Sequence, residues 1–291
     1  MTGESMMMDN LTHKTLFTIP EPRYSTALAT VKPLPVQRKI TGNKQVDAYL
    51  WVLEVIKTNE PAHLGAAETA LKKLKITPKE AQKKYADYLM KSGTAAFQVA
   101  FGTFSMDNPQ GYIDRAKTQI SDAAKVRATF ESYEAALELT KPEKLMLVGE
   151  LAEIYEAGYY WNEKELAEGC MRGDRVNETD KLRKATAKGF AEQLPEPHTL
   201  SDVVREFLYW DWLCQMRNVA DKELDPGGYG DERYYIYDRE DYLEKKLATI
   251  QAVNRQEAID VCKWVLEEER FHDHELTDKI ILNLVGECAN A

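Results

Sequence analysis

The densest group of residues that could bind another molecule lies between residues 221 and 244, where carboxylates and tyrosines are interleaved. Nine acidic residues stand there against three basic ones. Tyrosine combines apolar area with a hydroxyl group, and surrounding carboxylates favour a basic partner. We therefore expect an outward-facing surface that binds a protein. Its expected residues are Tyr229, Asp231, Glu232, Tyr234, Tyr235, Tyr237, Asp238 and Asp241. Alternatively, the tyrosines cover the core of their own domain.

A second candidate is a basic pair of predicted helices, 64–75 and 78–91, separated by a short turn. Their lengths suit a helix-turn-helix. The lysines that could contact DNA phosphates are Lys72, Lys73, Lys79, Lys83 and Lys84. No arginine occurs between Arg38 and Arg115, so the segment is poorly equipped to recognise guanine. A DNA-binding regulator is therefore an alternative hypothesis, alongside the interpretation of these lysines as a solvated face.

A third candidate is a metal site. Glu269 and His272 have the ExxH spacing, which would place both on one face of a helix, and His274 follows closely. The polar character of 267–275 favours a surface cluster over a metal-dependent enzyme. Residues 221–232 have acids at several EF-hand positions, but Pro226 occupies the place of the required glycine. We predict no catalytic residue, no resident metal and no cofactor, because no P-loop, GxSxG, GxGxxG or CxxC motif occurs.

The charge is unevenly distributed along the 291 residues. Residues 1–100 contain 14 Lys and Arg against 9 Asp and Glu, whereas residues 101–291 contain 24 against 39. The acidic balance disfavours nucleic acid as the main partner, because carboxylates repel phosphates. The four cysteines are widely spaced, and there is neither a leader-like N-terminus nor an apolar run of about 20 residues. We expect a cytoplasmic protein with reduced thiols and no contact with a membrane.

The elements that position these groups are predicted to be helices. Apolar residues recur every three or four positions from Gln45 onward, and Thr77, Pro78 and Glu80 form a helix start with a capping box. The expected helices are 45–56, 64–75, 78–91, 109–139, 142–155, 162–172, 178–193, 200–221, 240–252 and 255–286. Only 26–31 and 229–238 suggest β-structure. The apolar segment 96–104 is expected to be buried.

The fold class predicted is mainly α: a multi-helix globular bundle with an extended, proline-containing N-terminal arm and at most a small β element. We expect an arm at 1–44, a basic-to-neutral helical region at 45–140 and an acidic helical region at 141–291. The leading functional hypothesis is a non-enzymatic binding or inhibitor protein that forms a homo-oligomer. If its partner binds nucleic acid, carboxylates could replace phosphates, as in an anti-defence factor of a phage or mobile element.

Overall fold

The computed structural model describes residues 11–25, 33–227, 233–272 and 275–286. Within these ranges the chain is predominantly helical and contains no strand, which confirms the mainly α fold class. The predicted strand at 26–31 lies outside the described residues. No described helix has the combination of length and apolar character that crossing a membrane requires. The chain divides into two compact units, which are described separately.

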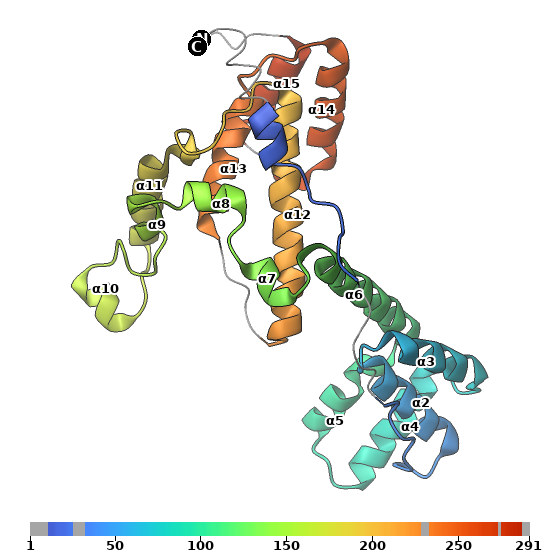
Figure 1. Cartoon of the computed structure of the whole chain (residues 1–291). Helices are drawn as coiled ribbons and strands as arrows, with labels where there is room; N and C mark the ends of the chain where they lie inside the picture. Colours follow the sequence, from blue (N-terminus) through green and yellow to red (C-terminus); the bar gives the residue numbers. More distant parts are fainter. Residues whose placement is uncertain (1–10, 26–32, 228–232, 273–274, 287–291) are drawn as a thin grey trace. The chain divides into compact units, whose positions relative to one another are not determined.

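The first unit, called the basic unit here, consists of residues 22–136 with 222–226. Its principal elements are α2 (Lys44–Ile56), α3 (Pro61–Lys73), α4 (Pro78–Lys91), α5 (Ala96–Thr103), η1 (Phe104–Met106) and α6 (Pro109–Phe130). Helix α2 is central and packs against α3, α4 and α6 (Figure 1). The core between α2, α3 and α6 is apolar, with Val52, Leu64 and Ile113 fully or almost fully buried. The capping box predicted at Thr77 and Glu80 is present and starts α4.

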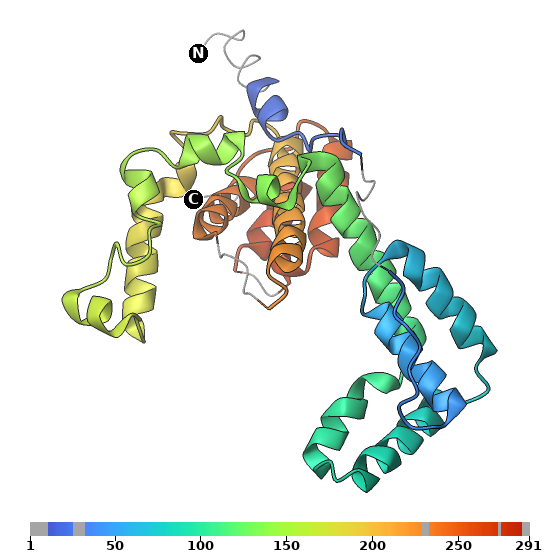
Figure 2. The same cartoon turned by 60° about the horizontal axis from the view of Figure 1, so that its bottom comes forward.

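The second unit, called the acidic unit here, contains the described residues of 1–21, 137–221 and 227–291. Its principal elements are α8 (Lys141–Met146), α9 (Glu150–Glu153), α10 (Glu163–Glu168), α11 (Asp174–Ala187), η2 (Lys188–Phe190), α12 (Leu200–Leu224), α13 (Tyr234–Leu247), α14 (Arg255–Glu267), η3 (Glu269–Phe271) and α15 (Thr277–Val285). The short helix α7 (Tyr133–Leu137) precedes α8. Helices α12 to α15 form a bundle, and α9 to α11 project from its side (Figures 1 and 2).

Several predicted helices were too long. The helix expected at 109–139 ends at Phe130, because Glu131 adopts a positive φ of 70°. The helix expected at 142–155 divides into α8 and α9 around Gly149, whose φ is 58°. The helix expected at 255–286 is interrupted after Glu267. The suggestion of β-structure at 229–238 was wrong for Tyr234–Asp238, which belong to α13.

The segment predicted to be a buried centre is largely on the surface. Val99 and Thr103 are buried, and α5 packs chiefly against α4. Phe97, Phe101 and Phe104 are 70–81% exposed. Apolar character alone predicted burial here, but burial also requires a neighbouring element on each face of a helix.

Candidate binding surfaces

The predicted tyrosine and carboxylate surface on α13 is only partly outward-facing. The side chain of Tyr235 is buried, and its hydroxyl donates to Glu143 Oε1 at 2.8 Å. Asp238 is also buried, and Arg183 donates to both of its oxygens at 2.8 and 3.1 Å. The expectation that Tyr235 and Asp238 face outward was therefore wrong. The helical register of α13 turns positions three and four residues apart toward the interior.

Tyr234 and Tyr237 of α13 are about half exposed. The guanidinium of Arg183 lies 5.0 Å from the centre of the Tyr234 ring. Asp241 is partly exposed and pairs with Lys184 at 2.5 Å. Carboxylates along this part of α13 therefore already have basic partners within the unit. Tyr229, Asp231 and Glu232 lie outside the described residues.

Other charged groups of the acidic unit form a buried network between α12 and α13. Arg239 donates to both oxygens of Glu206, at 2.7 and 3.0 Å, and both side chains are fully buried. His13 Nε2 lies 2.9 Å from Glu206 as well. Burial alone would raise the pKa of Glu206, but Arg239 and His13 hold it below its ordinary value. Because Arg239 neutralises the charge of Glu206 inside the protein, we interpret this carboxylate as a structural residue.

A second region combines aromatic side chains with carboxylates that remain on the surface. Glu150, Glu153, Glu156 and Glu163 are exposed, and among the described residues none of the four has a basic side chain within ion-pair distance. No lysine, arginine or histidine occurs between Lys144 and Lys164. Tyr159 is 43% exposed and packs edge-on against Tyr160, with ring centres 4.9 Å apart. We call this group, Glu150, Glu153, Glu156, Tyr159 and Glu163, the acidic aromatic surface.

The carboxylates of α9 lie close to the phenol of Tyr159. Partial desolvation raises the pKa of Tyr159, and the negative charges of Glu150 and Glu153 raise it further. A tyrosine hydroxyl is protonated at neutral pH, so that of Tyr159 can donate a hydrogen bond. This surface therefore presents clustered negative charges together with an exposed aromatic ring, a combination that favours a basic partner.

The backbone around this surface is fixed at both ends. On one side, Tyr155 points inward, donates to Asp238 at 2.7 Å and stacks on Phe190. On the other side, Asn162 caps α10 in a capping box with Glu165. Between them Gly158 has a φ of 90°, a conformation that other residues rarely adopt. These contacts hold Tyr159 and the neighbouring carboxylates toward solvent.

Sequence reasoning missed the acidic aromatic surface, although a signal for it was present. Residues 148–163 have the same mixture of acids and aromatics as 221–244, and they lack any basic residue. The three-residue spacing of Glu150, Glu153 and Glu156 also favours one face of a helical turn. The absence of basic residues nearby distinguishes this segment from the neutralised surface of α13.

The five lysines proposed to contact DNA are all exposed. Lys72 and Lys73 end α3, while Lys79, Lys83 and Lys84 lie along α4. Helix α3 packs mainly against α2 and α6, and α4 packs against α2 and α5. Contact with nucleic acid through these lysines stays a prediction.

The proposed metal ligands do not share a helix face. Glu269 begins the short helix η3, and His272 follows it with an extended backbone, ψ 125°. Both side chains are exposed, and His274 lies outside the described residues. Within the described ranges no three His, Cys, Asp or Glu side chains are arranged to hold a metal ion. The expectation that the ExxH spacing places both groups on one helix face was wrong, because the helix ends at Glu267.

Comparison with known proteins leaves these surfaces as the basis for any functional conclusion: no protein-family model, no curated protein and no solved structure matches this chain.

Proposed function

We propose that this protein is a non-enzymatic binding protein whose acidic aromatic surface docks onto a basic surface of a protein partner. The observation that carries the proposal is the set of four exposed carboxylates between residues 150 and 163, two of them close to Tyr159, with no basic residue between Lys144 and Lys164. Elsewhere in the acidic unit, carboxylates such as Glu206, Glu143 and Asp238 are buried in internal ion pairs.

The negative charge of such a surface would increase both the rate of association with a basic partner and the selectivity for it. Clustered carboxylates accelerate encounter with a positively charged partner and disfavour acidic ones. Tyr159 adds aromatic area that can be buried at low conformational cost. Glu156 and Glu163 flank the tyrosines in sequence and would supply the charged rim.

A finer form of the proposal concerns the class of partner. A protein that binds nucleic acid presents lysines and arginines to phosphates, and clustered carboxylates could occupy the same cations. The protein would then act as an inhibitor, in the manner of an anti-defence factor from a phage or mobile element.

The first experiment is affinity capture with charge-reversed variants. The test variant carries Glu150→Lys, Glu153→Lys and Glu156→Lys. The control carries Asp260→Lys, Glu267→Lys and Asp278→Lys, which reverses three exposed carboxylates on α14 and α15 with the same change in net charge. We expect the wild type and the control to retain a partner that the test variant loses. Equal retention or equal loss by both variants would contradict the proposal.

The inhibitor step has its own measurement. A captured partner is mixed with labelled nucleic acid, and the wild-type protein is added as a competitor. We expect the wild type to displace nucleic acid from the partner and the test variant to fail. A ternary complex containing all three components would exclude the inhibitor step while leaving partner binding intact.

We also propose that the homo-oligomer forms through α5. The segment Thr94–Met106 contains no charged residue, so two copies of this face can approach without repulsion. Each phenylalanine carries roughly 150–250 Å² of surface, so Phe97, Phe101 and Phe104 leave about 450 Å² exposed per copy. A dimer would bury roughly 900 Å² through these rings, below the usual range for stable interfaces, so it should be reversible.

The oligomer is tested by analytical ultracentrifugation across a range of protein concentrations. The variant Phe97→Ser, Phe101→Ser should remain a monomer where the wild type self-associates. Leu266→Ser, which changes an exposed apolar residue of α14, serves as the control and should behave as the wild type. A wild type that stays monomeric at every concentration would contradict this proposal.

A further inference from the structure

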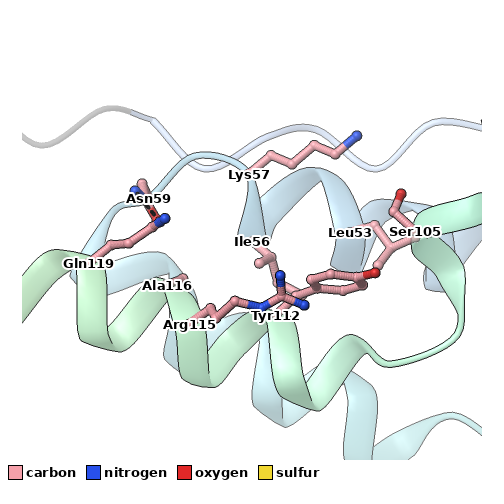
Figure 3. Close-up of a pocket in the computed structure, with 9 residues that line it drawn as sticks. All are labelled: Leu53, Ile56, Lys57, Asn59, Ser105, Tyr112, Arg115, Ala116 and Gln119. Carbon is pink, nitrogen blue, oxygen red and sulfur yellow. Dashed lines mark hydrogen bonds between the residues drawn. The ribbon is translucent and has the colours of Figure 1, made fainter. Parts of the chain in front are cut away.

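A cavity of about 340 Å³ lies in the basic unit between α2 and α6 (Figure 3). Its volume is at the lower end of the range for small-molecule sites. Leu53, Ile56 and Ala116 form apolar lining, and Ile56 and Ala116 are themselves part of the core. The remaining lining residues are Lys57, Asn59, Ser105, Tyr112, Arg115 and Gln119.

Two cationic side chains belong to this lining. The guanidinium of Arg115 lies 4.8 Å from the centre of the Tyr112 ring, and Lys57 ends α2. No carboxylate is among the lining residues, and within the described residues neither cation is in an ion pair. Asp107 lies outside the lining and accepts from the Tyr112 hydroxyl at 3.3 Å. The two cations are therefore available to an incoming anion.

The amide groups at one end of the cavity are fixed relative to each other. Asn59 Nδ2 donates to Gln119 Oε1 at 3.1 Å, as Figure 3 shows. This bond leaves the Gln119 amide nitrogen as a donor for a further group. The backbone of Asn59 has a φ of 55°, a left-handed conformation that asparagine tolerates better than most residues. The cavity thus combines an amide donor, two cations, an aromatic ring and an apolar floor.

We propose that this cavity binds a small organic anion: a carboxylate or phosphate monoester attached to an apolar group. The anionic head would lie between Lys57 and Arg115, since a guanidinium can donate two parallel hydrogen bonds to either head group. The apolar body would cover Leu53 and Ile56 beside the Tyr112 ring. An inorganic anion would leave that floor uncovered, so the apolar group is part of the proposal. The site is independent of the acidic aromatic surface.

The test uses phenyl phosphate, benzoate, benzyl alcohol and inorganic phosphate as probes, each titrated into the full-length protein. Binding is followed by NMR through the side-chain amide signals of Asn59 and Gln119. We expect saturable shifts for at least one of the two aromatic anions, with a dissociation constant of about 1 mM or tighter. Benzyl alcohol and inorganic phosphate should each bind at least about tenfold more weakly, because each lacks one half of the recognised group.

Substitutions in the protein test whether the probes bind in this cavity. Arg115→Ala should weaken the preferred anion about tenfold or more, and Arg115→Lys should weaken it less. Lys91→Ala removes an exposed lysine at the end of α4, outside the cavity, and should leave binding unchanged. Preference for phenyl phosphate would assign a phosphate head, and preference for benzoate a carboxylate head. Absence of saturable binding by both, or equal binding of benzyl alcohol, would overturn the proposal.

Discussion

The buried ion pair between Glu143 and Arg217 gives the sharpest test of how the acidic unit is held together. Glu143 is fully buried, and Arg217 donates to its two oxygens at 2.6 and 2.7 Å. Thr140 and Tyr235 also donate to this carboxylate. The perturbation is Arg217→Met, which keeps the approximate length of the side chain and removes the charge.

The expected loss follows from what remains around Glu143. Removing one member of a buried pair costs about 3–5 kcal/mol, because the other charge stays out of water. The donors from Thr140 and Tyr235 survive, and Arg233 stays 3.9 Å from the carboxylate, so we expect a loss near the lower limit, about 3 kcal/mol. That is a large part of the roughly 5–15 kcal/mol that stabilises a typical domain.

The assay is urea unfolding followed by tryptophan fluorescence. Four of the five tryptophans lie in the acidic unit, so the signal reports mainly on that unit. The control is Lys164→Met, because the pair Lys164–Glu168 is 3.8 Å long with side chains 81% and 49% exposed. Exposed pairs contribute about 0–1 kcal/mol, so the control should unfold almost as the wild type does.

A double variant separates the lost charge pair from altered packing. Glu143→Gln in the Arg217→Met background removes a buried charge that has lost its closest partner, so we expect it to restore at least about 1 kcal/mol. If Arg217→Met costs no more than Lys164→Met, the pair has no structural role. If Glu143→Gln fails to restore stability, the loss came from packing and the electrostatic reasoning is refuted.

Three further predictions concern unfolding at acidic pH, the buried Asp238 and half-exposed Tyr237 of α13, and the lysines of α3 and α4. Burial would raise the pKa of Glu143, but Arg217 and Thr140 hold it below the ordinary value of 4.5, and the pKa of Glu206 is likewise lowered. As the pH falls, these carboxylates take up protons in the unfolded chain before they do so in the folded protein. The melting temperature should therefore fall as the pH drops below about 4.5. Asp238→Ala should lower the free energy of unfolding by about 2–4 kcal/mol, and Tyr237→Ala by under about 1 kcal/mol, in urea titrations. In a DNA mobility shift, the lysines of α3 and α4 should give at most a sequence-independent complex that disappears between about 50 and 200 mM salt. A sequence-specific complex would instead support the DNA-binding alternative.

The sequence predicted helix boundaries well where capping residues, prolines or glycines mark them locally. Thr77, Pro78 and Glu80 provide a cap, a first-turn proline and a capping box, and α4 begins there. Such signals act within four residues, so no knowledge of the rest of the fold is needed. Two of the missed boundaries, at Glu131 and Glu268, lack a glycine or proline at the break. The break between α8 and α9 does contain a glycine, Gly149, and that signal was overlooked.

The orientation of side chains was harder to predict, because it depends on partners distant in sequence. Tyrosine and isoleucine favour strands, which suggested β-structure where α13 begins. As a helix, α13 turns Tyr235 and Asp238 toward Glu143 and Arg183, respectively, and both partners lie more than 50 residues earlier. Similarly, nothing in the sequence of 96–104 shows that the outer face of α5 lacks a covering helix. The acids at 150–163 differ from those at 221–244 mainly in lacking basic neighbours.

The most direct test of the central claim is the affinity of the captured partner for three forms of this protein, measured by calorimetry at low and moderate salt. We expect Glu150→Lys, Glu153→Lys, Glu156→Lys to weaken binding by about 100-fold or more. The control with Asp260→Lys, Glu267→Lys, Asp278→Lys should stay within about threefold of the wild type, and wild-type binding should weaken as salt rises. Equal affinities for the two triple variants would show that the acidic aromatic surface is not where the partner binds.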